Sequence, residues 1–243
     1  MIKYKFMRGF IRFCYTFMLG RITVTGGENI PSEDEIHIVV TNHNSVADSS
    51  LMMLAFPPRR WRFFAGRKWG EHPVWGPMLT WVGAIYVTEG VADRKALKEA
   101  TDAIKLGDGF GLAPEGHRSK TGSMMKGMDG AAYLANRTNA IILPIGITET
   151  DKLWDNLAAL KITNAGIQIG EPFMLPDIGR RVRARDLPLM TEFIMAHIAA
   201  QLPESYRGVY ADSPALAAIL AGEDPWKALQ VAEEDEALES MMV

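Results

Sequence analysis

The chain of 243 residues has little cysteine and little histidine: one cysteine, Cys14, and five histidines. A single cysteine excludes an intramolecular disulfide and a structural zinc site built on several thiolates. The histidines show no pair at metal-ligand spacing, so no metal site is predicted. A Gly-x-Ser-x-Gly segment is also missing, which argues against the nucleophile elbow of α/β-hydrolases.

Long apolar runs are missing as well. The apolar run 13–20 follows a basic start, but Arg21 closes it after eight residues. A membrane-spanning helix needs roughly 20 apolar residues, and a signal peptide needs a small-x-small cleavage site that does not follow here. We therefore expect the N-terminal segment neither to span a membrane nor to be removed.

Excess positive charge is absent too, because the formal net charge is -3. This balance gives no reason to expect a nucleic-acid partner. The charges are nevertheless unevenly distributed: those of residues 1–21 are all basic, and acidic residues crowd the last 21. No linker interrupts residues 1–200 and no repeat is visible, so one large domain is the better interpretation.

The N-terminal segment reads as an amphipathic helix. On a helical wheel one stripe carries five large apolar residues, Met7, Cys14 and Met18 widen it, and Lys5, Arg8 and Arg12 lie opposite. The five residues of the stripe are Ile2, Phe6, Phe10, Phe13 and Phe17. Phenylalanines facing arginines favour a helix that lies in a membrane interface, although packing on the protein's own core is the alternative.

Apolar segments with strand character alternate with helical patterns along the rest of the chain. Strands are predicted at 22–25, 36–40, 62–65, 84–87, 109–112, 140–145 and 166–169, and helices at 48–54, 92–106, 126–137 and 187–201. The alternation predicts a single three-layer α/β domain with a central, mostly parallel or mixed sheet flanked by helices and preceded by the amphipathic helix. We expect residues 1–20 to be that helix, 21–210 the domain, and 211–243 an acidic, Ala-rich tail with one or two marginal helices.

A histidine and a carboxylate lie just past the predicted central strand 36–40. The run Asn42-His43-Asn44-Ser45-Val46-Ala47-Asp48 ends where active sites of α/β sheets lie. Residues five apart on one helix point about 140° away from each other, so His43 and Asp48 can meet only across a strand-loop-helix junction. A histidine supported by a carboxylate forms a general-base pair.

A second polar cluster, residues 113–122, follows the strand predicted at 109–112. Glu115 and Arg118 lie three residues apart in a turn held open by proline and by Gly116, and both can project into the same crevice. A guanidinium offers a planar donor fork for phosphate. For an isolated Glu-x-x-Arg, mutual pairing on the surface would be the ordinary interpretation.

The two clusters together resemble the 1-acylglycerol-3-phosphate acyltransferases of the glycerolipid acyltransferase family. The first block is Asn42-His43-x-Ser45-x-x-Asp48, and the third is Pro114-Glu115-Gly116-x-Arg118-Ser119. Residues 83–87 resemble the second motif of that family and residues 142–145 resemble the fourth. Four blocks in order, over roughly residues 20–210, are far more specific than either main motif alone.

The resemblance implies acyl transfer from an acyl thioester, acyl-CoA or acyl-acyl-carrier-protein, to the hydroxyl of 1-acylglycerol-3-phosphate, giving phosphatidate in phospholipid biosynthesis. His43 would be the general base and Asp48 its support. Glu115, Gly116 and Arg118 would bind the acceptor, and backbone N–H groups after His43 are candidate oxyanion donors. The implied partners are the acceptor, the thioester carrier and the membrane surface, with no bound cofactor; the implied place is the cytoplasmic face of the membrane, peripheral or monotopic.

Two departures from the family pattern bear on the acceptor. The second motif usually ends in an arginine that contributes to phosphate binding, whereas this chain continues Thr88-Glu89, with Arg94 and Lys95 as the nearest basic residues. The third motif carries His117 where threonine is typical. Another lysolipid or an acylated amino-acid lipid is therefore an alternative acceptor. A thioesterase and a non-catalytic relative that binds lipid or acyl carrier are alternatives of other classes.

Overall fold

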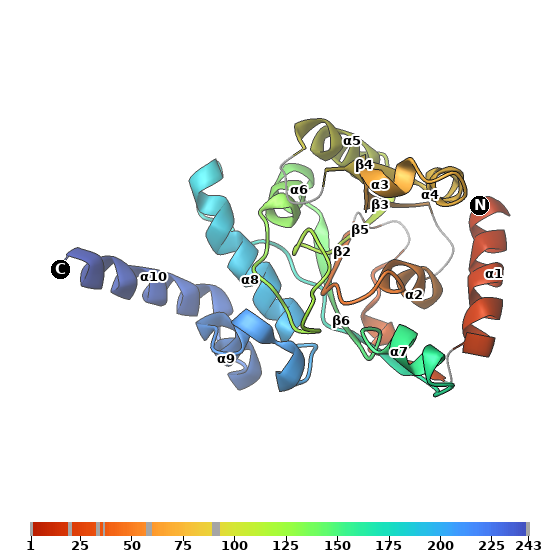
Figure 1. Cartoon of the computed structure of the whole chain (residues 1–243). Coiled ribbons are helices and arrows are strands. Elements are labelled where there is room, and N and C mark those ends of the chain that lie inside the picture. The colour runs from red at the N-terminus through yellow and green to blue at the C-terminus, as the bar shows by residue number, and fades with distance from the viewer. Residues whose placement is uncertain are drawn as a thin grey trace.

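A single seven-stranded sheet forms the centre of the protein. The computed structural model describes residues 2–18, 21–32, 35, 37–56, 60–88 and 93–241 (Figure 1). The strands are β1 (Arg21–Thr25), β2 (His37–Thr41), β3 (Trp61–Gly66), β4 (Ala84–Val87), β5 (Gly109–Leu112), β6 (Ile141–Thr148) and β7 (Asn164–Ile169), in the order β1-β7-β6-β2-β5-β3-β4. All seven predicted strands are confirmed.

The sheet is mixed, but its middle is parallel. β6, β2, β5, β3 and β4 run in one direction, β7 is antiparallel to β6, and β1 is parallel to β7. Because β2 is buried along its whole length, it reads in the sequence as a continuous apolar run. The carboxyl ends of five parallel strands therefore meet at one edge, where loops from β2 and β5 lie side by side.

Helices cover both faces of the sheet and give three layers (Figure 1). Ile38 and Val40 of β2 face a core shared with α5, α6 and α8, whereas Val39 faces a second core shared with α1 and α2. The α-helices are α1 (Ile2–Met18), α2 (Asp48–Ala55), α3 (Arg67–Gly70), α4 (Trp75–Val82), α5 (Arg94–Lys105), α6 (Gly130–Thr138), α7 (Leu153–Ala158), α8 (Leu187–Ala199), α9 (Pro214–Ala221) and α10 (Pro225–Met241). This architecture confirms the predicted fold class.

Some helix boundaries differ from the prediction. α6 begins at Gly130 rather than at residue 126, because the preceding backbone bonds elsewhere: the Met128 N–H donates to the Pro114 carbonyl and the Gly127 N–H to the Tyr210 hydroxyl. The short helices α3, α4 and α7 were not predicted. α9 and α10 pack against α8, and Leu216 belongs to the main core.

The N-terminal helix packs with a different stripe from the one that its phenylalanines form. Met7 and Tyr15 are buried in contact with the body of the protein, whereas Phe6, Phe10 and Phe13 are exposed. α1 touches α2 and α4. Thus the helix both packs on the core and presents an aromatic face to solvent. Within the described residues, none of the helices is long and apolar enough to cross a membrane.

Candidate active site

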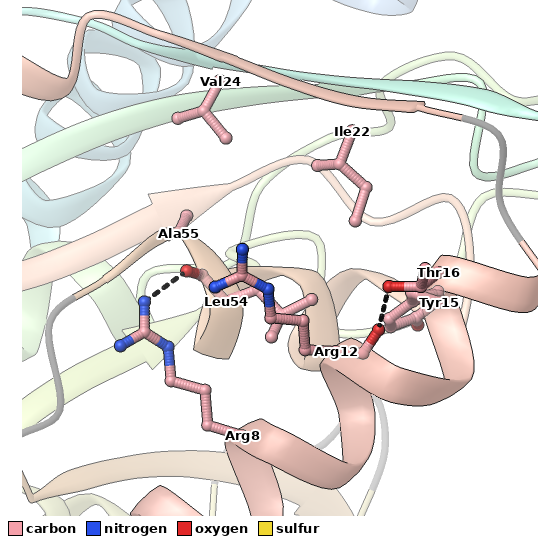
Figure 2. Close-up of a pocket in the computed structure, with 8 residues that line it drawn as sticks. All are labelled: Arg8, Arg12, Tyr15, Thr16, Ile22, Val24, Leu54 and Ala55. Carbon is pink, nitrogen blue, oxygen red and sulfur yellow. Dashed lines mark hydrogen bonds between the residues drawn. The ribbon is translucent and has the colours of Figure 1, made fainter.

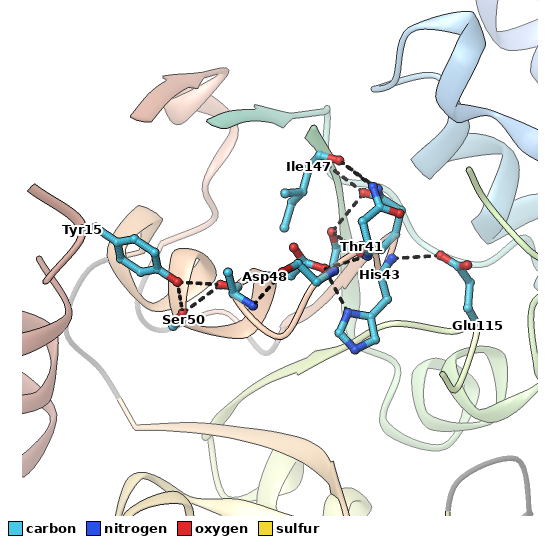
Figure 3. Close-up of polar contacts among 11 residues, drawn as sticks. Tyr15, Thr41, His43, Asp48, Ser50, Glu115 and Ile147 are labelled. Carbon is cyan, nitrogen blue, oxygen red and sulfur yellow. Dashed lines mark hydrogen bonds and ion pairs between the residues drawn. The ribbon is translucent and has the colours of Figure 1, made fainter. Parts of the chain in front are cut away.

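His43 and Asp48 meet at the carboxyl end of β2, as the sequence predicts (Figure 3). The His43 Nδ1 lies 2.9 Å from the Asp48 Oδ2. Asp48 is the first residue of α2, so the intervening loop turns its carboxylate back toward the strand end. The His43 side chain is 24% exposed and that of Asp48 is 2% exposed, which leaves only the imidazole open to a ligand.

The loop between the two residues fixes the carboxylate through its backbone. The N–H groups of Asn44 and Ser45 both donate to the Asp48 Oδ2, each over 2.8 Å. Charge-assisted bonds of this kind fix the position and orientation of a buried carboxylate. These two N–H groups therefore support Asp48 and are not open to an oxyanion in this arrangement.

The contact with Asp48 also determines which nitrogen of His43 can act as a base. A carboxylate oxygen only accepts, so the Nδ1 that faces it carries the proton. The Nε2 of the neutral ring then keeps its lone pair and is free to take a proton. This arrangement provides the tautomer that general-base chemistry requires.

Asn42 anchors the start of the loop to the neighbouring strand. Its Nδ2 donates to the Ile147 carbonyl and its Oδ1 accepts from the Ile147 N–H, both over 2.8 Å. The side-chain amide thus pairs with β6 as a backbone peptide would. Asn42 is buried, and this pairing satisfies both polar groups of its amide.

Glu115 holds the backbone of His43 from the other side (Figure 3). Its Oε1 accepts the His43 N–H over 2.9 Å, and its Oε2 accepts the Met125 N–H over 3.0 Å. The Ser119 N–H donates to the His43 carbonyl over 2.8 Å. The loop after β5 therefore binds both the N–H and the carbonyl of the histidine.

The Glu115 carboxylate is buried, and burial raises its pKa to about 7, against the opposing effect of the two N–H donors. The partners of Glu115 are thus these two backbone groups, and not Arg118 as in the ordinary interpretation of an isolated Glu-x-x-Arg. In this arrangement Glu115 supports His43 and does not present a free carboxylate to an acceptor.

Gly116 and Arg118 lie on the exposed side of the same loop. Gly116 has a φ of 73°, and a Cβ there would approach the Met128 Sδ to 2.5 Å. Glycine is needed at this turn because other residues adopt this conformation at a cost and would press on Met128. Arg118 is exposed, so its guanidinium is open to an anion from solvent.

Tyr15 connects the N-terminal helix with the start of α2 and was not singled out from the sequence. Its hydroxyl lies 2.5 Å from the Ser50 Oγ and donates to the Ala47 carbonyl over 3.3 Å (Figure 3). At the other end of α2, the Arg8 guanidinium donates to the Leu54 carbonyl over 3.1 Å. The sequence carries one sign of this contact: positions 8 and 15 are seven residues apart and so lie on one face of a helix.

A cavity of about 340 Å³ lies beside this contact, between α1, the C-terminal end of α2 and β1 (Figure 2). Arg8 and Arg12 point into it, and Ile22 and Val24 form an apolar wall. His43, Asp48 and Glu115 do not line this cavity. Among the described residues, no group of three or more His, Cys, Asp or Glu side chains is placed to hold a metal ion.

The second-motif region lies farther along the same edge. Val87 ends β4, which is three strand positions from β2, or about 14 Å at the usual spacing of strands. Arg94 and Lys95 are exposed at the start of α5. Glu89 lies outside the described residues.

A family model described as Acyltransferase matches residues 21–148. The chain belongs to this acyltransferase family. The matched segment contains all four motif blocks, from Asn42 to Ile145.

Two relatives and one solved structure agree with that membership. The chain is 27% identical over 135 residues to a chloroplastic 1-acyl-sn-glycerol-3-phosphate acyltransferase of Arabidopsis thaliana, covering 55% of this chain and 37% of the plant protein. It is 23% identical over 176 residues to the 1-acyl-sn-glycerol-3-phosphate acyltransferase of Streptococcus pneumoniae, covering 72% and 64%. The chain thus spans less than two thirds of either relative.

The structural likeness covers more of both chains. The crystal structure of the 1-acyl-sn-glycerophosphate acyltransferase PlsC from Thermotoga maritima aligns with a TM-score of 0.61 and 25% sequence identity, over 78% of this chain and 75% of the other.

Proposed function

We propose that this protein transfers a fatty acyl group from an acyl thioester, acyl-CoA or acyl-acyl-carrier-protein, to the hydroxyl of 1-acylglycerol-3-phosphate, giving phosphatidate. The observation that carries the proposal is the contact of His43 with Asp48, which leaves the Nε2 as a base at the open edge of the sheet. The names of the relatives support lysophosphatidate as the acceptor.

In the proposed reaction the acceptor hydroxyl gives its proton to the His43 Nε2 as its oxygen attacks the thioester carbonyl. Asp48 stabilises the imidazolium that forms. The tetrahedral intermediate then collapses, the carbon–sulfur bond breaks, and the thiolate takes the proton from the imidazolium. The products are the ester and the free thiol, so no covalent acyl-enzyme is needed.

The loop after β5 has two roles in this proposal. Glu115 positions His43 through the His43 N–H, and Arg118 binds the acceptor phosphate from the exposed side of the loop. Gly116 lets the backbone turn between them. Arg94 and Lys95, at the start of α5, replace the arginine that the second motif lacks.

The acceptor is a membrane lipid, so the proposal includes docking at the cytoplasmic face of a membrane. The exposed face of Phe6, Phe10 and Phe13 would lie in the interface, peripheral or monotopic. Trp81 extends this face, since its ring lies 6.2 Å from that of Phe6. Aromatic side chains are enriched at this depth of a bilayer.

The test is transfer of a labelled acyl group from a thioester to lysophosphatidate. Loss of the general base in His43→Ala should lower the rate by about 10³-fold. His72→Asn is the matched control, because His72 is exposed in another loop and the asparagine oxygen can accept the Trp75 N–H that the His72 Nδ1 accepts. Undiminished transfer in His43→Ala would refute the mechanism.

The same assay separates the alternatives. Faster transfer to another lysolipid or to an acylated amino-acid lipid would identify that lipid as the acceptor. Acyl release without any acceptor would identify a thioesterase. Lipid binding with no transfer from any donor would indicate a non-catalytic relative.

A further inference from the structure

The turn that follows α7 exposes more apolar surface than a water-facing turn should. Leu160 is 94% exposed, Ile162 is 70% exposed and Trp154 is 52% exposed. Leu157 adds a fourth exposed apolar side chain on the same short segment. Single exposed apolar residues are ordinary, but a group of four on α7 and the turn after it indicates a contact surface.

The backbone of this turn is strained at the most exposed residue. Leu160 has a φ of 54°, in the left-handed region. Glycine and asparagine adopt this conformation readily, whereas for other residues it costs on the order of 1 kcal/mol. Both the backbone and the hydration of Leu160 are therefore unfavourable in water, and such costs cluster at functional positions.

Hydrogen bonds hold the turn in place. The Lys161 N–H donates to the Asn156 carbonyl over 2.7 Å, and the Leu160 N–H donates to the Leu157 carbonyl over 3.1 Å. The Asn156 Nδ2 donates to the Thr163 Oγ1 over 3.0 Å, and Thr163 is buried. The leucine is thus fixed in its outward position.

The turn lies at the same edge of the sheet as the candidate active site. α7 follows β6, whose Ile147 pairs with Asn42 beside His43. After the turn, Asn164 of β7 pairs with Arg21, which follows the end of α1. Figure 1 shows α7 near that end of α1. The apolar turn therefore lies near the end of α1, the helix whose aromatic face is proposed to contact the membrane.

We propose that the α7 turn, residues 154–162, is a second lipid-contacting surface that inserts Leu160 and Ile162 into the bilayer beside the active site. The inference rests on the proposed function in one respect, that the acceptor is a membrane lipid. A protruding apolar tip suits insertion between lipids, whereas a protein partner would require a broader complementary face.

The charges of the turn determine which lipids it binds. Lys152 is paired with Glu149 over 2.8 Å, and Asp155 offsets Lys161. The turn therefore binds through apolar burial, independently of anionic lipid, in contrast to the basic helix α1.

The test is Leu160→Asn, measured as partitioning into pure phosphatidylcholine vesicles without acyl donor. Loss of the leucine side chain that the proposal inserts into the bilayer should lower partitioning about tenfold. Asparagine favours the left-handed conformation, so the unfolding temperature should stay the same or rise. A variant that folds better and binds lipid less well is not expected of a structural residue.

Leu106→Asn is the matched control. Leu106 is 82% exposed, but it precedes β5 and so lies at the opposite edge of the sheet. Its substitution should leave partitioning unchanged. Equal partitioning of Leu160→Asn and the wild type would overturn the proposal, as would an equal loss in Leu106→Asn.

An activity measurement keeps this proposal separate from the proposed function. Leu160→Asn should transfer acyl groups at the wild-type rate to a short-chain lysophosphatidate dispersed in buffer, and more slowly to the long-chain acceptor in vesicles. A partitioning defect in a protein that acylates no acceptor would support the lipid surface and refute the proposed function.

Discussion

At the scale of the residue, Glu115 shows how a motif carboxylate can support the site through the backbone. Each of its oxygens accepts one backbone N–H, one from His43 and one from Met125, in a buried position. The resulting bond fixes the main chain that carries the imidazole. Burial of the Glu115 carboxyl group also raises its pKa, which makes the stability of the protein depend on pH.

The stability of the protein should therefore depend on pH through Glu115. Burial raises its pKa from 4.5 to about 7, so the protonated form is favoured in the folded state. This contribution is complete below pH 4.5 and is lost as the pH rises through 7. Between pH 5 and pH 8 it should lower the free energy of unfolding by about 2 kcal/mol.

Denaturant unfolding at both pH values measures this slope, and Glu115→Gln serves as the comparison because its amide does not titrate. The free energy of unfolding of the variant should fall less between pH 5 and pH 8 than that of the wild type. Equal falls in the two proteins would contradict the prediction.

Residue-scale prediction from the sequence succeeded where the interaction is local. His43 and Asp48 are five residues apart, and the strand before them is unmistakable, so their meeting follows from the junction alone. The backbone role of Glu115 did not follow, because it depends on the path of a loop 72 residues away.

At the scale of the element, α1 holds both ends of the helix that begins with Asp48. Tyr15 bonds at the N-terminal end of α2, and Arg8 bonds at its C-terminal end. A shift of α1 on a membrane would therefore reach Asp48 through hydrogen bonds. The helix that carries the aromatic face and the start of α2 are connected in this way.

Tyr15→Phe should consequently slow turnover without weakening substrate binding. Loss of the hydroxyl removes the bonds of α1 to the Ser50 hydroxyl and the Ala47 carbonyl, which stay bonded to each other. We therefore expect kcat to fall severalfold with KM unchanged, and stability to fall by about 1 kcal/mol. Steady-state kinetics on lysophosphatidate vesicles measures the effect. Thr16→Val is the control, since that hydroxyl bonds only within α1 to the Arg12 carbonyl. Similar losses in both variants would contradict the coupling.

Helices and strands were predicted well where their residues are continuously buried. They were predicted less well where contacts with distant segments determine the end of an element or the face that packs. The buried strands were all identified, whereas α6 starts later than its apolar pattern suggests because Gly127 and Met128 bond to other segments. The apolar stripe of α1 was recognised, but its packing stripe is the neighbouring one, which includes Met7 and Tyr15. The two stripes overlap on the wheel, and only the position of α2 separates them.

At the scale of the whole molecule, the charges of the two ends lie far apart. α1 and α10 extend on opposite sides of the protein (Figure 1). Lys5 and Arg12 are exposed on α1, and Glu233 and Glu234 are exposed on α10. Because salt screens charges beyond about 10 Å, the acidic end should hardly oppose binding of the basic end to an anionic membrane.

Vesicles containing anionic lipid provide the test. The double variant Lys5→Gln, Arg12→Gln should bind them roughly thirtyfold less tightly at about 0.1 M salt, since each basic residue near such a surface contributes about 1 kcal/mol. The counterpart Glu233→Gln, Glu234→Gln should change binding less than twofold. A larger gain in this second variant would show that the acidic helix lies near the membrane.

The three-layer architecture followed from the alternation of strands and helices, but the strand order did not. The chain crosses the sheet so that β2 lies between β6 and β5, and these neighbours come from far along the sequence. Such pairings are decided by packing between distant segments, which periodicity does not report.

The hydrogen bonds that Glu115 and Ser119 make to the His43 backbone have a consequence for synthesis of the chain. The histidine and its carboxylate emerge early from the ribosome, but the groups that bind the His43 backbone belong to Glu115 and Ser119. A nascent chain that ends before this loop carries the whole first motif without its support. The base thus acquires its fixed orientation only when more than a hundred residues have been translated, so a truncated product would retain the motif but lack the organised site.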